Sequence, residues 1–146
     1  MRRVALLIGA VLLAGCAKKE APPAEVAAAP SLNVADLAGT WTTQTTAPGS
    51  DSVLVTGAIT ATADPAGWTM ALAGRDPMPM MITVSGDSLM TSMGPYESVL
   101  RPGTQVTTNG ILHLVNGQLT GPMTAHYVTA GADSVLNLWT TATKAP

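Results

Sequence analysis

Turn signals recur at short intervals along residues 31–146, and this spacing constrains the fold more than any other feature of the sequence. Asn116-Gly117, Gly86-Asp87 and Pro48-Gly49 are examples. The segments between such signals are rich in Thr, Val, Ile and Leu, which favour strands. The pattern therefore predicts about eight short strands, which span roughly 39–46, 52–63, 67–73, 80–85, 88–93, 104–115, 118–128 and 134–142.

The composition also favours an all-β domain. The 146 residues include 20 Thr, 14 Gly and 11 Pro, and they include no Phe. The one segment that we expect to form a helical turn is 31–38, just before the first strand. Because no segment resembles a crossover helix, we expect the strands to pair antiparallel with their neighbours in the chain.

Two turns fix the register of their hairpins. Asn116-Gly117 is typical of a two-residue type I′ turn, so facing residues have numbers that sum to 233. This register predicts one apolar face, with Val106, Thr108, Leu112, Leu114, Leu119, Met123, Ala125 and Tyr127, and one mostly polar face, with Gln105, His113, Gln118, Thr120, Thr124 and His126. A type II′ turn at Gly86-Asp87 would pair Met80 with Met93, Ile82 with Thr91 and Val84 with Leu89.

Eight antiparallel strands with one apolar face each predict an up-and-down barrel, because closure removes exposed edges. A two-sheet sandwich is the alternative. Gly39-Thr40-Trp41 resembles the start of the first strand in lipocalins, and the resemblance implies that Trp41 closes the narrow end of the barrel. The chain departs from that family in its short length, in lacking a second signature motif, and in having Lys144 where an arginine would stack on Trp41.

The first fifteen residues have the three-part pattern of an export signal, with Arg2 and Arg3 before the apolar run 4–13. That run is about half of the roughly 20 residues that a membrane-spanning helix needs. Leu13-Ala14-Gly15-Cys16 resembles the lipobox of bacterial lipoproteins. The resemblance implies that the signal is removed before Cys16 and that this cysteine carries lipid, which anchors the protein to a membrane.

The sequence thus divides into a signal peptide (1–15), a lipidated cysteine with an Ala- and Pro-rich tether (16–30) and a β-barrel domain (31–146). The tether is too poor in large apolar residues to form a core. Cys16 is the single cysteine, so no intramolecular disulfide is possible. Ala17 stands where many Gram-negative lipoproteins of the inner membrane have aspartate. In a Gram-negative cell we therefore expect the outer membrane, facing the periplasm.

The connection 94–103 is the longest, and long loops at a barrel mouth often carry binding groups. We therefore select Tyr96, Glu97 and Arg101 as candidate ligand-binding residues, although Glu97 and Arg101 could instead form an ion pair that holds the loop. Trp41, Met80 and Met93 complete the candidate set, because they are expected on the interior face.

Other chemistries have less support in the sequence. The eight methionines, with the run Met78-Pro79-Met80-Met81, allow a copper hypothesis, yet alternation turns Met81 away from Met80, and methionine commonly fills cores. The register places His113 and His126 on the same polar face but far apart along it, which predicts two surface histidines. We expect no catalytic residues, no bound metal and no cofactor. The formal net charge of −2 disfavours nucleic acid as a partner.

From these observations we expect a non-enzymatic, lipid-anchored envelope protein whose barrel holds a small apolar molecule. A structural or adaptor lipoprotein that acts through protein contacts is the alternative, and periplasmic copper binding through methionines is another. A barrel of eight strands can be filled by its own side chains or can hold one small ligand. The volume of the interior cavity therefore discriminates between the first two hypotheses.

Overall fold

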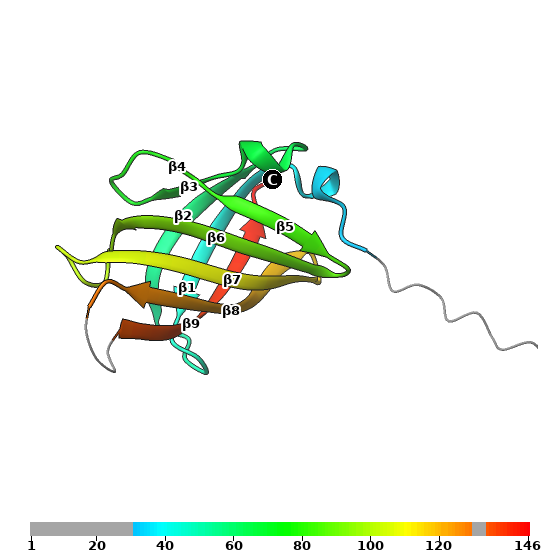
Figure 1. Ribbon diagram of the computed structural model, residues 1–146. Helices are drawn as coiled ribbons and strands as arrows, with labels where there is room; N and C mark the ends of the chain where they lie inside the picture. The colour runs from blue at the N-terminus through cyan, green and yellow to red at the C-terminus, as the bar shows by residue number, and fades with distance from the viewer. Residues whose placement is uncertain (1–30, 130–133) are drawn as a thin grey trace, which may run out of the picture.

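The computed structural model describes residues 31–129 and 134–146. The predicted export signal, lipobox and tether fall on residues outside the described ranges. The short 3-10 helix η1 (Val34–Leu37) precedes the sheet, and a second one, η2 (Pro65–Gly67), joins two strands. The strands are β1 (Gly39–Thr46), β2 (Val53–Ala61), β3 (Thr69–Leu72), β4 (Met78–Pro79), β5 (Met81–Ser85), β6 (Ser88–Glu97), β7 (Gln105–Val115), β8 (Gln118–Tyr127) and β9 (Val135–Lys144) (Figure 1).

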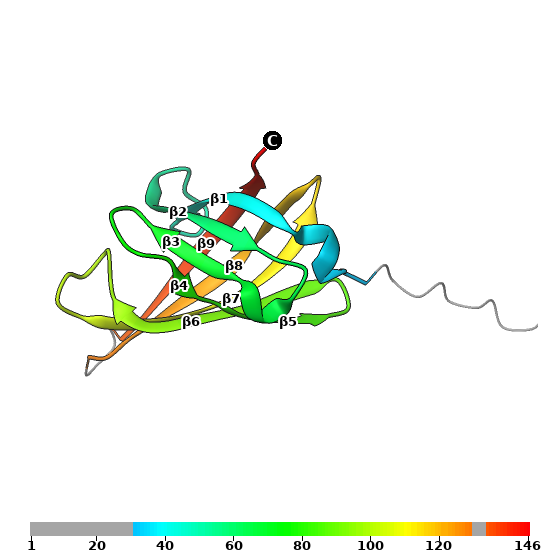
Figure 2. The same cartoon turned by 90° about the horizontal axis from the view of Figure 1, so that it is seen from above.

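The strands form one antiparallel sheet that curls into a nearly closed barrel (Figures 1 and 2). Their order is β4-β3-β2-β1-β9-β8-β7-β6-β5, so all consecutive strands except β4 and β5 pair with each other, and β1 also pairs with β9. The two strands at the ends of the sheet, β4 and β5, are separated in the chain by Met80 alone. The predicted lipocalin-like up-and-down barrel is confirmed.

A short additional strand precedes one of the predicted strands. The strand expected over 80–85 is present as β5, which pairs with β6, whereas β4 lies before the expected range and pairs with β3. The backbone N–H of Met80, between them, donates to the carbonyl oxygen of Trp68 at 2.9 Å. The chain therefore leaves one neighbour and joins the other at this residue, which completes the circuit of the barrel.

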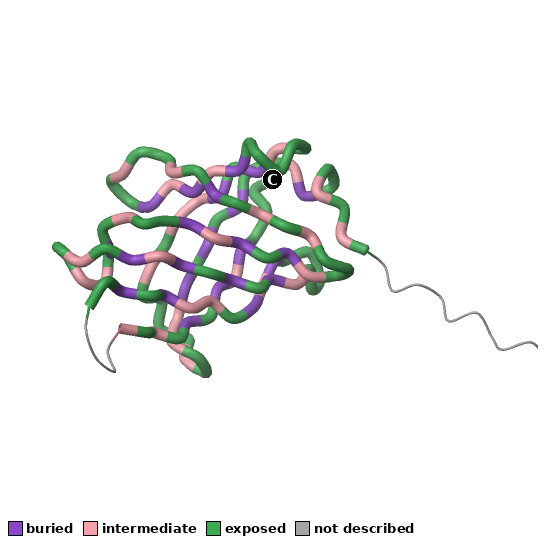
Figure 3. The backbone as a smooth tube through the Cα atoms, viewed as in Figure 1, coloured by how far each residue is buried: buried purple, intermediate pink, exposed green. Residues whose placement is uncertain are grey.

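Alternating burial explains why the strands curl. In β1, Trp41, Thr43 and Thr45 are buried, whereas Thr42 and Gln44 between them are exposed. Figure 3 shows the same alternation of buried and exposed residues along the long strands. Each strand thus has one face that must leave water, and a closed sheet buries all these faces together.

The register predicted from Asn116-Gly117 is confirmed. Val115 pairs with Gln118 and Val106 pairs with Tyr127, which are the first and last pairs of the ladder. Asn116 and Gly117 have φ values of 51° and 79°, as a type I′ turn requires. The predicted faces also hold, except that Leu114, expected inside, is 47% exposed because it lies at the end of the hairpin.

The second predicted register is confirmed over β5 and β6, where Val84 pairs with Leu89 and Ile82 with Thr91. The expected pair of Met80 and Met93 is wrong, because the ladder ends at Met81 and Ser92. The predicted loop 94–103 is also too long, since β6 continues to Glu97 after a register shift between Met93 and Tyr96. Tyr96 and Glu97 are therefore strand residues.

The end of the barrel beside η1 is closed by packed side chains. Trp41 is 2% exposed and Trp68 is 0% exposed, and both belong to a core cluster with Leu37 of η1. The indole Nε1–H of Trp41 donates to the carbonyl oxygen of Leu37 at 2.8 Å, which attaches η1 to the barrel. Trp41 thus closes this end, and we call it the narrow end.

Lys144 lies in the place expected for a stacking arginine. Its Nζ atom is 5.6 Å from the centroid of the Trp41 ring and donates to the carbonyl oxygen of Asp36 at 3.2 Å. A lysine therefore makes the cation–π contact at the end of the last strand, and it also satisfies a carbonyl group of η1. The departure from the lipocalin pattern changes the residue type but keeps the contact.

Candidate functional site

A small cavity lies inside the barrel toward the end opposite η1. Its volume is about 50 Å³. A cavity needs roughly 10–15 Å³ on this measure to hold one water molecule, whereas a cavity of about 150 Å³ holds benzene. The interior is thus nearly filled in this conformation. The lining consists of Thr43, Thr45, Val55, Met70, Leu72, Met93, Tyr96, Ser98, Val99, Leu100, Val106, Thr108, Met123, Ala125, Tyr127 and Leu138.

Small side chains explain why the space lies at this end. Four small residues point into the cavity from β1, β7 and β8, namely Thr43, Thr45, Thr108 and Ala125. The interior of the narrow end is instead occupied by large side chains such as Trp41. The hydroxyl groups of Thr45 and Thr140 are hydrogen-bonded to each other at 2.9 Å. Within the described ranges, each buried side-chain nitrogen or oxygen has a hydrogen-bond partner. The lining therefore presents mostly apolar groups to anything that enters.

A short loop, residues 98–104, covers the cavity, and we call it the lid. Ser98 is 3% exposed, and its Oγ accepts hydrogen bonds from the backbone N–H groups of Leu100 and Arg101, both at 3.1 Å. Its own N–H donates to the carbonyl oxygen of Thr104 at 2.8 Å. The lid is thus folded on itself, and Val99 and Leu100 from its tip line the cavity.

Two candidate residues hold the lid through different contacts. Glu97 Oε1 accepts a hydrogen bond from the backbone N–H of Gly103 at 3.0 Å. The Arg101 guanidinium carbon lies 4.1 Å from the centroid of the Tyr127 ring, and Tyr127 also lines the cavity. The carboxylate therefore closes the loop, and the guanidinium packs on an aromatic wall of the cavity.

Arg75, in the turn after β3, joins the two sides of the barrel near the lid. Its guanidinium donates to the carbonyl oxygen of Glu97 in β6. The pairing of β6 with β5 ends at Ser92, so on that side Glu97 has no strand partner. The hydrogen bond from Arg75 is the contact that Glu97 makes there. Leu72 from β3 and Tyr96 from β6 line the cavity behind this contact.

Tyr96 is the titratable residue of the cavity wall with a perturbed pKa. Burial raises the pKa of its phenol above the usual value of 10, and the negative charge of ionised Tyr127 acts in the same direction. A hydrogen bond with Thr108 and the positive charge of Arg75 oppose the shift. The Tyr96 hydroxyl is therefore neutral at physiological pH.

The six predicted ligand-binding residues lie in three places. Tyr96 and Met93 line the cavity, and Glu97 and Arg101 hold the lid. Trp41 is in the core of the narrow end, and Met80 is buried beside Trp68, with no part in the cavity lining. The sequence suggests Ser98 as a turn residue of this loop, and its contacts with Leu100 and Arg101 agree with that role. It had no signal for Arg75, which reaches β6 from a distant turn.

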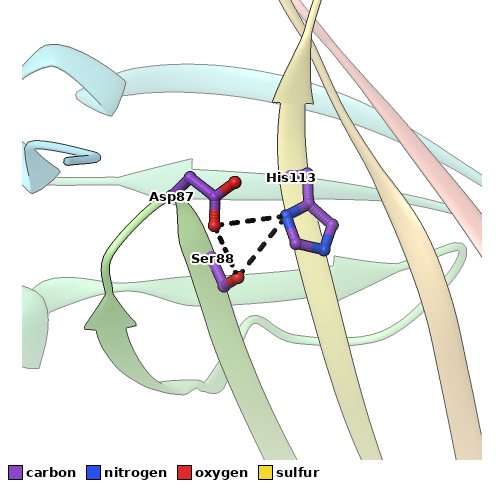
Figure 4. Close-up of polar contacts among 3 residues, drawn as sticks. All are labelled: Asp87, Ser88 and His113. Atoms are coloured by element: carbon purple, nitrogen blue, oxygen red, sulfur yellow. Dashed lines mark hydrogen bonds and ion pairs between the residues drawn. The ribbon is translucent and has the colours of Figure 1, made fainter. Parts of the chain in front are cut away.

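A serine, a histidine and an aspartate lie together outside the cavity, at the turn between β5 and β6 (Figure 4). Ser88 Oγ is 3.4 Å from Nδ1 of His113, and Asp87 Oδ1 is 3.9 Å from the same nitrogen. Ser88 Oγ also donates to Asp87 Oδ1 at 3.1 Å. A catalytic triad needs the serine and the acid on opposite nitrogens of the imidazole. Both lie beside Nδ1 here, so the arrangement is a polar surface cluster.

This cluster was missed at the sequence level. Ser88 and His113 are cross-strand partners in β6 and β7. The two-residue turns fix the ladders β5–β6 and β7–β8, but β6 and β7 are joined by the lid, whose length leaves their register open. A register shift within β6 adds to the ambiguity.

The methionines divide between the core and the surface. Met70, Met80 and Met93 are buried in one core cluster, whereas Met81 is 69% exposed, as the predicted alternation requires. In the part of the chain that the structure describes, no three His, Cys, Asp or Glu side chains form a group suited to a metal ion. Core filling therefore accounts for the buried methionines.

No family model, no curated protein and no solved structure matches this chain. Among the described residues, no helix has the length and apolar character that crossing a bilayer would need. The candidate site therefore stands on its own geometry, with an apolar cavity, a self-bonded lid and two arginines at the mouth of the barrel.

Proposed function

We propose that this chain is a non-enzymatic bacterial lipoprotein that is anchored through Cys16 and carries one small apolar molecule beneath the lid. The observation that supports the carrier role is the cavity lining, in which apolar side chains dominate and the buried polar groups already have partners. An apolar guest loses no hydrogen bonds there, whereas a polar guest would have to give up its water without compensation.

The volume of the cavity limits how such a molecule binds. About 50 Å³ is too small for a ligand of benzene size, so Val99 and Leu100 must move out when the guest enters. The lid has the construction for this movement, because several of its hydrogen bonds lie within the segment from Glu97 to Thr104 and can move with it.

The anchor sets where this carrier works. Lipid on Cys16 would keep the barrel close to a membrane, and Ala17 favours the outer membrane, facing the periplasm, in a Gram-negative cell. Mass spectrometry of the chain purified from a bacterial envelope tests this part. We expect a mass that corresponds to a chain starting at Cys16 with attached acyl groups, and loss of that modification in Cys16→Ser. An unmodified Cys16 in the wild-type chain would overturn the anchor.

A fluorescence titration tests the carrier role. The titration uses residues 17–146, which include every buried residue of the described structure. The probe is N-phenyl-1-naphthylamine, an uncharged apolar molecule whose emission rises in apolar surroundings. We expect saturable binding that Ala125→Leu weakens about tenfold or more, because the new side chain fills the cavity. His126→Leu is the matched control, since His126 is the other neighbour of Ala125 in β8, is exposed and does not line the cavity. Equal binding by the two variants would overturn the carrier role.

An adaptor role is the second candidate, and one observation favours it. Only about 50 Å³ of the barrel interior is free. A barrel that is nearly filled by its own side chains can act as a rigid scaffold for protein contacts. Native mass spectrometry of the protein purified from its own envelope separates the two roles. A small-molecule adduct supports the carrier, whereas a bare barrel that co-purifies with one envelope protein supports the adaptor.

A further inference from the structure

The outer wall of the barrel has an apolar band that crosses five strands. Met90 of β6 pairs with Ile111 of β7, and Pro122 of β8 pairs with Trp139 of β9. Met81, Met90, Ile111 and Pro122 together line one open groove on this wall. Their exposed fractions are large, for example 69% for Met81, 48% for Ile111 and 42% for Trp139. A continuous band of this kind marks an interaction surface more often than scattered apolar residues do. We call these five residues the apolar band.

The wall around the apolar band lacks charge. The other residues that line the groove are Thr83, Thr91, Ser92, Asn109, Gly110 and Thr124, so within the described ranges no charged side chain lines it. The described acidic and basic residues lie in turns, in the lid, in η1 or at strand ends. Contact with an apolar medium would therefore require no charge to leave water.

Trp139 suits the boundary between lipid and water. Its indole Nε1–H donates to the Thr120 hydroxyl at 2.9 Å, so the one polar atom of the ring already has a partner. Tryptophan is enriched at such boundaries because its ring is large and apolar while its N–H is polar. The hydroxyl and amide groups beside the apolar band can bond to lipid headgroups.

The length of the chain before Ser31 brings the wall within reach of the membrane. Fourteen residues separate Cys16 from Ser31, and they span at most roughly 50 Å when fully extended. A short link of this kind holds the domain at an effective concentration of about the millimolar range near the bilayer. A surface that binds lipid only weakly by itself would then be occupied most of the time.

We propose that the apolar band rests on the bilayer, so that the anchored barrel lies on its β5–β9 side. This inference rests on the lipid anchor of the proposed function and is independent of the cavity. Residues 31–146 carry seven acidic and three basic side chains, so anionic lipid repels the domain. We therefore expect the domain to bind zwitterionic lipid better than anionic lipid.

The tryptophans provide a direct test. Trp41 and Trp68 are buried, so an aqueous quencher such as acrylamide reaches mainly Trp139. Cys16 is the only thiol, so a maleimide phospholipid can be coupled there to the chain 16–146 whether or not a cell lipidates it. On phosphatidylcholine vesicles we expect the quenching constant to fall about twofold or more below that of the uncoupled chain in solution. Trp139→Phe should remove most of the quenchable emission.

Two variants locate the protected surface. Met90→Asp combined with Ile111→Asp should return the quenching constant of the coupled chain to its solution value. Thr42→Asp is the matched control, because Thr42 is an exposed wall residue of β1, away from the apolar band, and this variant should keep the protection. Replacing half of the phosphatidylcholine with phosphatidylglycerol should weaken the protection.

Two results would overturn the proposal. Quenching of the coupled chain that equals the solution value would mean that the wall does not touch lipid. Protection that increases with the number of chains per vesicle would mean that a second copy covers the apolar band. The separate mass measurement on Cys16 decides whether cells attach the anchor, so failure of the anchor and failure of the lipid contact give different results.

Discussion

The two ends of the barrel are built by different means. At the narrow end, Trp41 and Trp68 fill the interior, and η1 is attached by side-chain bonds that cross between elements of the fold. At the mouth, threonines and Ala125 leave space, and the lid that covers it is held largely by bonds within its own segment. One end is therefore part of the cooperative core, and the other can change locally without unfolding the sheet.

The largest expected effect tests the narrow end. Trp41→Ala should lower the free energy of unfolding by about 3–5 kcal/mol, because it leaves a cavity and frees η1. Trp139→Ala is the control with the same change of side chain on the outer wall, and it should cost about 1 kcal/mol. Urea unfolding followed by circular dichroism measures both. Equal losses would mean that the narrow end is not the more cooperative region.

A matched pair of alanines tests the packing contrast. Ala142 is 0% exposed in the core cluster that includes Trp41 and does not line the cavity, whereas Ala125 is 2% exposed and lines it. Ala142→Leu should cost about 1–3 kcal/mol, because a filled core must distort to accept the larger side chain. Ala125→Leu should cost less, since free space accepts part of the added volume. Thermal unfolding compares the two variants, and a larger loss for Ala125→Leu would contradict the assigned cavity.

The contrast between the two ends also shows what the sequence predicts well. The barrel, the interior faces and the two registers follow from short turns such as Asn116-Gly117, because a two-residue turn fixes which residues face each other. The mouth depends on long-range placement. The extension of β6 to Glu97, the reach of Arg75 and the pairing of Ser88 with His113 involve strands that no short turn joins.

The packing of individual side chains is also hard to read from local patterns. Alternation predicts that Trp41 and Met80 face inward, but both go to the filled end, away from the cavity. Which end keeps free space depends on the sum of side-chain volumes from several strands. Small residues such as Thr43, Thr108 and Ala125 occur far apart in the sequence, and only the closed sheet brings them to one place.

A smaller effect is expected for the lid. Ser98→Ala removes the acceptor for the N–H groups of Leu100 and Arg101 and should cost about 1 kcal/mol, largely as local opening. Hydrogen exchange at these two amides should become several-fold faster, while exchange in β1 stays unchanged. N-phenyl-1-naphthylamine should also enter the cavity of this variant faster than that of the wild type. Equal acceleration in β1 would show that the lid and the core open as one unit.

The smallest expected effect concerns Tyr96 and appears only at alkaline pH. Burial raises the pKa of this phenol in the folded protein above its unfolded value near 10. Between these two pKa values the unfolded chain has already lost the proton that the folded chain keeps, so stability declines as the pH rises through this window. Below the unfolded pKa, the contribution of the neutral phenol is fully present.

Tyr96→Phe isolates this contribution, because phenylalanine keeps the ring and cannot ionise. We expect the stability difference between wild type and Tyr96→Phe to be constant from pH 7 to 9 and to shift in favour of the variant above pH 10. Urea unfolding at each pH measures the difference, and absorbance at 295 nm follows phenol ionisation. Because Tyr96 lines the cavity, a bound apolar guest should exclude more water from the phenol and raise its pKa further. A difference that stays constant through pH 11 would mean that the Tyr96 hydroxyl already contacts solvent at the mouth.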